Sequence, residues 1–296
     1  MTNTRARRQI LAVATAGVVV AGGVIAATAP AATAAALPTP DVLGGPGHAT
    51  VYASGMEVGP DGDLVVADTG NDAVRKLDGV TGVERWNYKA GQDGGDEAEN
   101  ARDVAIDKSG DVYVGDAATS RVIKLDGASG KFIATWSGPD GDKIGSPIGL
   151  TFSNDKVYVA DAAKRKIRIF DTSGKQLAWI GESGSCSLAA LRDVDADDAG
   201  NIYVANYTNN NIVKFSPSGS CLGGWGSPGT GNGQFKNPYG VRVANDPVWG
   251  ESVYVADSNN NRIQIFSTTG AFRASVGTTG APSQTGTFTT LRRVAV

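Results

Sequence analysis

The chain has 296 residues, which is enough for one large domain or two small ones. Hydrophobic residues make up 41% of it, so a buried core is possible, and its 40 glycines favour a turn-rich β protein. The formal net charge is −3 at pH 7, and no basic patch stands out beyond the N-terminus. A mildly acidic domain of this kind argues against binding to nucleic acid or to anionic membranes.

The first 36 residues are organised like an export signal. Arg5, Arg7 and Arg8 form a basic start, an apolar stretch runs from residue 10 to about residue 27, and small residues near the end offer cleavage positions. The adjacent arginines, followed by a spacer and two apolar residues, resemble a twin-arginine (Tat) signal, with the Sec route as the alternative. We therefore predict a secreted protein. An uncleaved membrane anchor is the competing interpretation, although Gly and Ala make the stretch a poor spanning helix.

A five-residue motif, three or four apolar or small residues closed by Asp or Asn, recurs along the rest of the chain. Its five copies occupy residues 64–68, 112–116, 157–161, 202–206 and 253–257, with spacings of 48, 45, 45 and 51 residues. Six residues after each Asp or Asn stands a β-branched residue, and nine residues after it stands Leu or Phe. Self-similarity at a fixed period of this length indicates a repeat architecture.

Each repeat contains the pattern of four short strands. An apolar alternation leads through a Gly-containing turn to the motif, a polar loop leads to a third strand, and a Ser-Gly-type turn leads to a fourth. Four antiparallel strands repeated every 40–50 residues are typical of a β-propeller blade. The predicted fold class is therefore all-β, a propeller with five complete blades and the start of a sixth.

Two recurring residue types are assigned structural roles. The Asp or Asn that ends each motif is expected to accept hydrogen bonds from backbone N–H groups of nearby turns, because an active site seldom needs five copies of one residue. The tryptophans of the fourth strands are expected to pack between blades, with sugar-stacking platforms as the alternative. These are Trp86, Trp136, Trp179 and Trp225.

The fifth repeat carries Pro238-Tyr239-Gly240, then the motif at 253–257, then Arg262-Ile263-Gln-Ile-Phe266 and a glycine. This pattern resembles the NHL repeat, and the resemblance covers about residues 42–296. NHL domains are usually six-bladed propellers, so the resemblance implies that fold. It implies no single function, because NHL propellers serve as protein-binding, RNA-binding and catalytic domains.

The predicted domain boundaries place the signal in residues 1–36 and the propeller in residues 37–296. The blades are expected at about residues 51–91, 101–141, 146–184, 191–227 and 237–278. A partial sixth blade covers residues 288–296, and residues 41–45 look like the outermost strand that closes it. Two strands of that blade are missing, and we favour a truncated chain over a true five-bladed ring because the last residues fit the start of a blade so well.

The sequence offers little for catalysis. Its one histidine, His48, lies in a loop, whereas the amidating and streptogramin-type lyases that share this fold use several histidines or a catalytic one. Gluconolactonase-like propellers need a calcium site of Glu, Asn and Asp on central strands. Glu57 and Asp195 lie at such positions, but Arg242 stands at the same position in blade five, where it would repel a cation and is placed to pair with Asp195. We therefore expect no catalytic residue, metal site or cofactor.

Charged residues alternate with uncharged ones just before the first strands. Blades two, four and six read Arg102-Asp103, Arg192-Asp193 and Arg292-Arg293, whereas blades one, three and five read Ser54-Gly55, Pro147-Ile148-Gly149 and Pro238-Tyr239-Gly240. In a six-bladed ring the charged side chains would surround one mouth of the channel. We predict that they bind a polar or anionic ligand there. The alternative is that each Arg–Asp pair caps its own loop with a local ion pair.

The only two cysteines, Cys186 and Cys221, predict a disulfide in an exported protein. In simple strand order they lie at opposite faces of the ring, beyond disulfide reach. The loop of residues 182–190 is long enough to bring Cys186 across.

The leading function is recognition or scaffolding outside the cell, with a protein or a polar cell-wall ligand bound on one propeller face and no membrane contact after signal cleavage. The alternative is a hydrolase or lyase that acts on a lactone or a small polar substrate at the channel mouth. The Ala-rich twin-arginine signal indicates a bacterial source.

Overall fold

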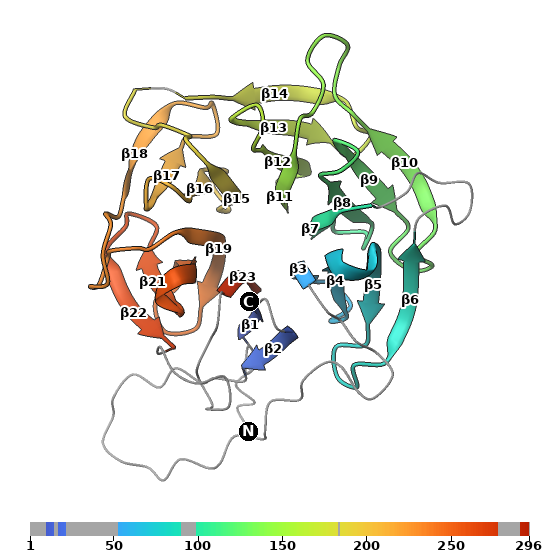
Figure 1. The fold of residues 1–296 in the computed structure, drawn as a ribbon, viewed down its shortest axis with the longest axis horizontal. Coiled ribbons are helices and arrows are strands. Elements are labelled where there is room, and N and C mark those ends of the chain that lie inside the picture. Colours follow the sequence, from blue (N-terminus) through green and yellow to red (C-terminus); the bar gives the residue numbers. More distant parts are fainter. Residues whose placement is uncertain are drawn as a thin grey trace, which may run out of the picture.

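The computed structural model describes residues 10–14, 17–21, 53–89, 99–182, 184–277 and 291–295. The elements in these ranges are β-strands, apart from two single-turn 3-10 helices, η1 (Thr69–Asn71) and η3 (Ser258–Asn260). Five four-stranded sheets stand around a central axis and form a propeller ring (Figure 1). The predicted all-β propeller with five complete blades is thereby confirmed. None of the described helices is long and apolar enough to cross a membrane.

In every blade the chain runs from the innermost strand to the outermost strand, and each strand pairs antiparallel with the next. Blade one consists of β3 (Ala53–Val58), β4 (Leu64–Asp68), β5 (Ala73–Leu77) and β6 (Glu84–Lys89). Blade two consists of β7 (Ala101–Ile106), β8 (Val112–Asp116), β9 (Arg121–Leu125) and β10 (Phe132–Trp136). Blade three consists of β11 (Pro147–Ser153), β12 (Lys156–Asp161), β13 (Lys166–Asp171) and β14 (Gln176–Ile180). Blade four consists of β15 (Leu191–Ala196), β16 (Ile202–Asn206), β17 (Asn211–Phe215) and β18 (Cys221–Trp225). Blade five consists of β19 (Pro238–Asp246), β20 (Gly250–Asp257), β21 (Arg262–Ser267) and β22 (Phe272–Val276).

The core of the protein lies between the blades. Every residue of β4, β8 and β16 is buried, because the second strand of each blade is covered on both faces by the neighbouring blades. Such strands have nearly continuous apolar sequences instead of alternating ones. The outermost strands alternate between covered and exposed side chains, as in the fourth strand of blade two.

Three of the four predicted tryptophans pack between blades. Trp86 and Trp136 are buried against glycine-containing turns of the next blade, and a Cβ added at Gly130 would lie 2.7 Å from the Trp86 ring. Trp225 packs in the same way and contacts Phe266. Trp179 is an exception to the prediction, because Ile180 takes the inward position in blade three and Trp179 is 52% exposed.

The Asp residues that close the repeated motif have the predicted structural role. Asp116 accepts hydrogen bonds from the N–H groups of Asn100 (3.2 Å) and Ala118 (3.1 Å), and Asp161 accepts from those of Gly145 and Ser146 (both 3.0 Å). Each carboxylate therefore ties the loop entering its blade to the end of the second strand. An arginine on the third strand adds an ion pair of 2.8 Å in three blades, namely Arg75–Asp68, Arg168–Asp161 and Arg262–Asp257.

A three-stranded sheet fills the space between blades five and one. Its order is β2 (Gly17–Ala21), β1 (Ile10–Ala14) and β23 (Leu291–Ala295), and β23 lies between β19 and β3 (Figure 1). The residues at 41–45, for which the sequence predicts a closing strand, lie outside the described residues. Strands β1 and β2 belong to the segment with the features of an export signal, whose cleavage stays a prediction.

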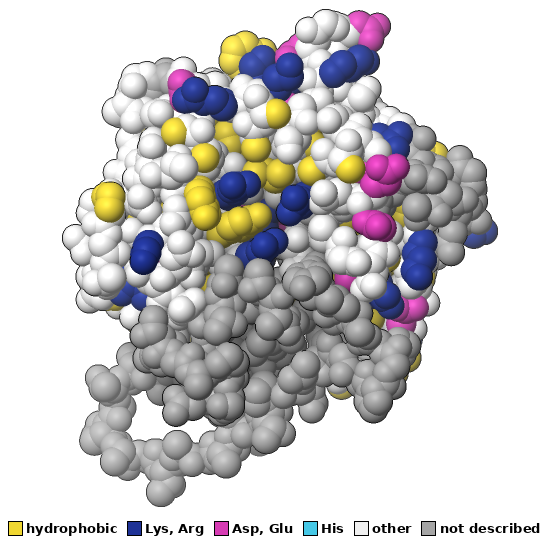
Figure 2. All heavy atoms as spheres, in the orientation of Figure 1, with side chains coloured by type: hydrophobic (Ala, Val, Ile, Leu, Met, Phe, Trp, Pro, Cys, Tyr) yellow, Lys and Arg dark blue, Asp and Glu magenta, His cyan; other side chains and the backbone are white. Residues whose placement is uncertain are grey.

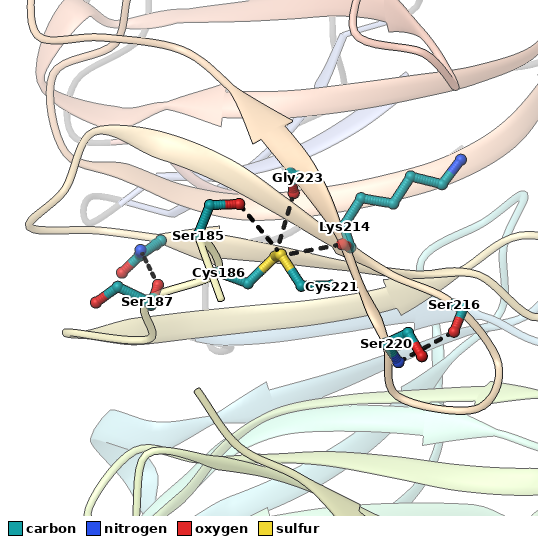
Figure 3. Close-up of a disulfide and its surroundings, with 9 residues drawn as sticks. Ser185, Cys186, Ser187, Lys214, Ser216, Ser220, Cys221 and Gly223 are labelled. Atoms are coloured by element: carbon teal, nitrogen blue, oxygen red, sulfur yellow. Dashed lines mark hydrogen bonds between the residues drawn. A yellow bond between two sulfur atoms is a disulfide. The ribbon is translucent and has the colours of Figure 1, made fainter. Parts of the chain in front are cut away.

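The predicted disulfide between Cys186 and Cys221 is present, with a Cα–Cα distance of 5.7 Å. Cys186 lies in the loop between β14 and β15 and reaches the outermost strand of blade four, where Cys221 is the first residue (Figure 3). The loop therefore follows the outside of the blade, as its length predicts. Cys186 is fully buried in the core cluster that joins blades three and four, next to Leu188.

Candidate functional site

The beginnings of the innermost strands converge at one mouth of the central channel. The pairing of each of the first four innermost strands with its second strand shifts by one residue near this end. The residue at the shift is Ser54, Arg102, Ile148 or Arg192, and β-bulges of this type redirect a side chain away from the regular alternation. Arg102 and Arg192 thus occupy equivalent places in blades two and four, as the sequence predicts.

The mouth combines guanidinium groups with tyrosine rings. The Cζ atom of Arg192 lies 4.9 Å from the Tyr207 ring centroid and 5.6 Å from that of Tyr239, and Arg292 Cζ lies 5.5 Å from Tyr239. Arg292 also donates to Ser54 Oγ at 3.4 Å. Basic side chains accordingly gather at the centre of this face, beside a hydrophobic patch (Figure 2). The charged and aromatic side chains form one continuous surface.

The other three predicted site residues lie one layer below the mouth. Asp103, Asp193 and Arg293 are 3%, 5% and 4% exposed, so a ligand at the mouth would not touch them directly. They alternate around the ring with glycines, and a Cβ at Gly55 would lie 2.3 Å from Asp103 Oδ1. The equivalent glycine in blade three, Gly149, would place a Cβ 2.8 Å from Asp193 Cα. The glycines of the odd blades therefore make room for the charged side chains of the even ones.

Arg293 holds the two buried carboxylates on the channel axis. Its Nη2 lies 3.1 Å from Asp103 Oδ2, and its Nη1 forms an ion pair with Asp193. Both carboxylates also join neighbouring blades, because Asp103 accepts from the Leu150 N–H at 2.7 Å and Asp193 accepts from the Val241 N–H at 2.9 Å. This layer therefore links the blades around the channel. The alternative of a local ion pair within each Arg–Asp dipeptide is not seen among the described residues, since the Asp side chains turn inward and the Arg side chains stay at the mouth.

A third charged layer lies deeper in the channel. Arg242 forms a two-pronged ion pair with Glu57, and its Nε lies 3.7 Å from Asp195 Oδ2. The contact of Arg242 with Asp195 agrees with the sequence, whereas Glu57 as the main partner was not predicted. The two residues are 185 positions apart and belong to blades one and five, so only closure of the ring brings them together.

Burial changes the pKa of carboxyl groups in both inner layers. It raises the pKa of Glu57 from 4.5 to about 7, with Arg242 opposing the change. It likewise raises the pKa of Asp103 from 3.8 to about 6, and Arg293 opposes this change. Burial also lowers the pKa of Arg293 itself. The channel therefore holds two carboxyl groups that titrate near neutral pH.

We expect the stability of the protein to fall as the pH rises from about 4.5 to 7.5. A carboxyl group whose pKa is higher in the folded state contributes stability that is complete below its unfolded pKa and is lost as the pH rises through its folded pKa. For Glu57 a change from 4.5 to about 7 corresponds to on the order of 3 kcal/mol. Thermal unfolding of the wild type against pH should therefore decline more steeply than that of Glu57→Gln. Glu84→Gln, which alters a carboxyl outside the channel, is the control and should leave the slope unchanged.

The deep layer does not fit a calcium site like that of gluconolactonase-like propellers. A Ca²⁺ ion takes six to eight oxygen ligands, and the oxygens of Glu57 and Asp195 are engaged by the guanidinium of Arg242. Thr151 donates to the other oxygen of Asp195, so both oxygens of this carboxylate already have a partner within the protein. In the described ranges no three His, Cys, Asp or Glu side chains gather in a way that could hold a metal ion.

Two family models match the chain. The model described as SMP-30/Gluconolactonase/LRE-like region matches residues 46–233, and the NHL repeat model matches residues 248–266. The chain is also 32% identical over 136 residues to peptidylglycine alpha-amidating monooxygenase from Rattus norvegicus, which is 41% of this chain and 14% of that protein. The likeness to the B form from Xenopus laevis is 32% over 133 residues, or 40% and 15%. The chain thus spans about a seventh of the length of these relatives.

Solved structures are similar over most of the chain. Virginiamycin B lyase from Staphylococcus aureus has a TM-score of 0.57 at 14% identity, over 79% of this chain and 72% of the lyase. A protein of unknown function from Bacteroides caccae has a TM-score of 0.65 at 12% identity, over 98% of both chains. At these identities the likeness shows the fold alone. The SMP-30 model, in contrast, covers more than half of the sequence, so the chain belongs to the SMP-30/gluconolactonase/LRE-like family of β-propellers, with an NHL repeat in its last complete blade.

Proposed function

We propose that this protein is a recognition module that binds an anionic group at the channel mouth. The observation that carries the proposal is the equivalent position of Arg102 and Arg192 at the start of their innermost strands, with Arg292 beside Arg192 at the Tyr239 ring. The Nε atoms of Arg102 and Arg192 are buried and have no hydrogen-bond partner among the described residues. Neither side chain forms an ion pair within the described ranges, so a carboxylate or phosphate group of a ligand would supply the negative charge that these guanidinium groups lack.

The proposal treats β23 as the innermost strand of a sixth blade, which places Arg292 in the ring. The hydroxyl of Ser258 donates to the carbonyl of Leu291, the first residue of β23. The hydroxyl of Thr69 donates in the same way to the carbonyl of Ala101, the first residue of blade two. Leu291 is fully buried in the core cluster of blade five. These equivalent contacts support the assignment of β23 as a blade start.

We place the module outside the cell, where a protein or a cell-wall component with exposed acidic groups would be its partner. The export-signal features of the first 36 residues support this location. The bond between Cys186 and Cys221 supports it independently, because disulfides persist in oxidising compartments and are rare in the cytosol.

Arg192→Ala is expected to weaken the binding of acetate and phosphate to the mouth about 5- to 10-fold, because one of three charge-assisted partners is lost. Isothermal titration at low salt measures this loss, and raising the salt concentration should weaken wild-type binding as well. Lys164→Ala is the control. Lys164 is exposed on the loop between β12 and β13, at the same face but away from the mouth.

The stability of Arg192→Ala should stay within about 1 kcal/mol of the wild type, because its side chain makes no ion pair within the described part of the chain. An equal loss of binding in Lys164→Ala would show that general surface charge, and not the mouth, attracts the anion. Unfolding of Arg192→Ala would instead show that the side chain is structural.

A hydrolase or lyase acting on a lactone or another small polar substrate is the second candidate. Family membership supports it, and so does Glu57, whose pKa of about 7 is suitable for a general base. The ion pair with Arg242 would have to open before Glu57 could take a proton from a substrate. Hydrolysis of a simple δ-lactone by the wild type, abolished in Glu57→Gln, would favour the enzyme over the binding module.

A further inference from the structure

We propose that the ligand of the mouth is an aromatic carboxylate, a compound or side group in which one carboxylate is attached to a planar ring. This inference rests on the proposed function, since it names the class of anion that the arginine mouth would take. It is carried by the charge balance along the channel axis and by the apolar wall beside the arginines.

The charge balance favours a ligand with a single negative charge. Five guanidinium groups lie along the axis in the three layers, belonging to Arg102, Arg192, Arg242, Arg292 and Arg293. Four carboxylates face them, belonging to Glu57, Asp103, Asp193 and Asp195. At about pH 8, Glu57 and Asp103 are ionised as well, because their raised pKa values are about 7 and about 6, and one positive charge is then left over. One carboxylate neutralises it, whereas a phosphate monoester would bring an excess of negative charge into the mouth.

The wall of the mouth offers a surface for a ring. Tyr207 and Tyr239 meet edge to face with their centroids 6.1 Å apart. Ile148 occupies the bulge position between Arg102 and Arg192 around the ring and, at 7% exposed, lies buried beneath this surface. Figure 2 shows hydrophobic side chains directly beside the basic ones at the centre of this face. A ring attached to a carboxylate bound by Arg192 would therefore lie against tyrosine and not against water.

Tyr239 has the central place in this arrangement. Arg192 and Arg292 both lie over its ring, at 5.6 Å and 5.5 Å from the centroid. Contact with an aromatic face restrains a guanidinium and leaves its N–H groups available to hold a carboxylate in the two-pronged geometry that arginine favours. Tyr239 is thus a positioning residue for the arginines and also part of the apolar wall.

The test compares acetate, benzoate and phenyl phosphate in titrations of the full chain at about pH 8 and at one ionic strength, so that Glu57 and Asp103 are ionised. We expect benzoate to bind about 10-fold more tightly than acetate, and phenyl phosphate to bind no more tightly than benzoate. Tyr239→Leu should reduce the ratio of benzoate to acetate affinity to about twofold, and Tyr239→Phe should keep it. Trp179→Leu removes an exposed aromatic side chain on the outer rim and should leave the ratio unchanged.

The outcomes separate this inference from the function on which it rests. If acetate binds with dependence on Arg192 but as tightly as benzoate, the anion site stands and the aromatic carboxylate is wrong. Tighter binding of phenyl phosphate would overturn the choice of a carboxylate. If none of the three probes binds, the proposed function fails as well. Should Tyr239→Leu not fold, the wild-type affinity ratio decides, together with nuclear Overhauser contacts between benzoate and tyrosine ring protons.

Discussion

Arg293→Met is expected to destabilise the protein by about 3–5 kcal/mol, because it leaves the carboxylates of Asp103 and Asp193 buried without their shared cation. Chemical denaturation at pH 8 measures the effect, since both carboxyl groups are then ionised in the unfolded state. The loss should shrink as the pH falls toward 5, because protonation removes the uncompensated charge, and burial already raises the pKa of Asp103 to about 6.

Two variants separate buried charge from simple loss of volume. The triple variant Arg293→Met, Asp103→Asn, Asp193→Asn should recover a large part of the stability, because neutral amides keep acceptors for the N–H groups of Leu150 and Val241. Arg292→Met, the neighbouring arginine at the mouth, should change stability by less than about 1 kcal/mol. A loss below 1 kcal/mol in Arg293→Met would contradict the structural role of this layer.

Loss of the disulfide is expected to cost about 3–4 kcal/mol, because Cys186 and Cys221 close a loop with a sequence separation of 35 residues. The bridge restricts the unfolded chain, and it also pins the loop of residues 184–190 to the outer strand of blade four. The double variant Cys186→Ala, Cys221→Ser should therefore unfold at a temperature lower by on the order of 10 °C.

Reduction of the wild type provides the matched comparison, since it breaks the bond without removing a sulfur atom from the buried position of Cys186. Dithiothreitol should lower the unfolding temperature of the wild type and leave the double variant unchanged. Equal stability of the oxidised and reduced wild type would show that the loop is held by packing of Leu188 and its neighbours alone.

The proposed site depends on the same layered channel. The charged groups of the inner layers pair with one another, so the outermost arginines are the ones left to meet a ligand. This division explains why six charged residues that are adjacent in pairs along the chain have two different roles. It also predicts that variants of the inner layers act on stability, whereas variants of the mouth act on binding.

The sequence by itself determined the elements of this fold, because strands and turns are specified by local patterns. The motif at 64–68 and its four copies, with fixed distances to the next apolar residues, predicts the second and third strands of every blade, and all five lie where expected. The disulfide could also be predicted from the sequence, because the chain has two cysteines and a loop long enough to bring them together. The fourth strands were predicted less well: Trp179 stands one residue before the inward position that Trp225 takes in blade four, so Ile180 points inward and Trp179 points outward.

Only the tertiary structure decided which charged side chains meet. Adjacent residues in a strand point in different directions, so Arg192 stays at the mouth while Asp193 turns to Arg293, a hundred residues away in the chain. Arg242 and Glu57 come together because the ring closes, and no local pattern carries that information. The physical reason is that each blade forms from strands that are adjacent in the sequence. The contacts along the propeller axis, in contrast, depend on how all the blades pack around it.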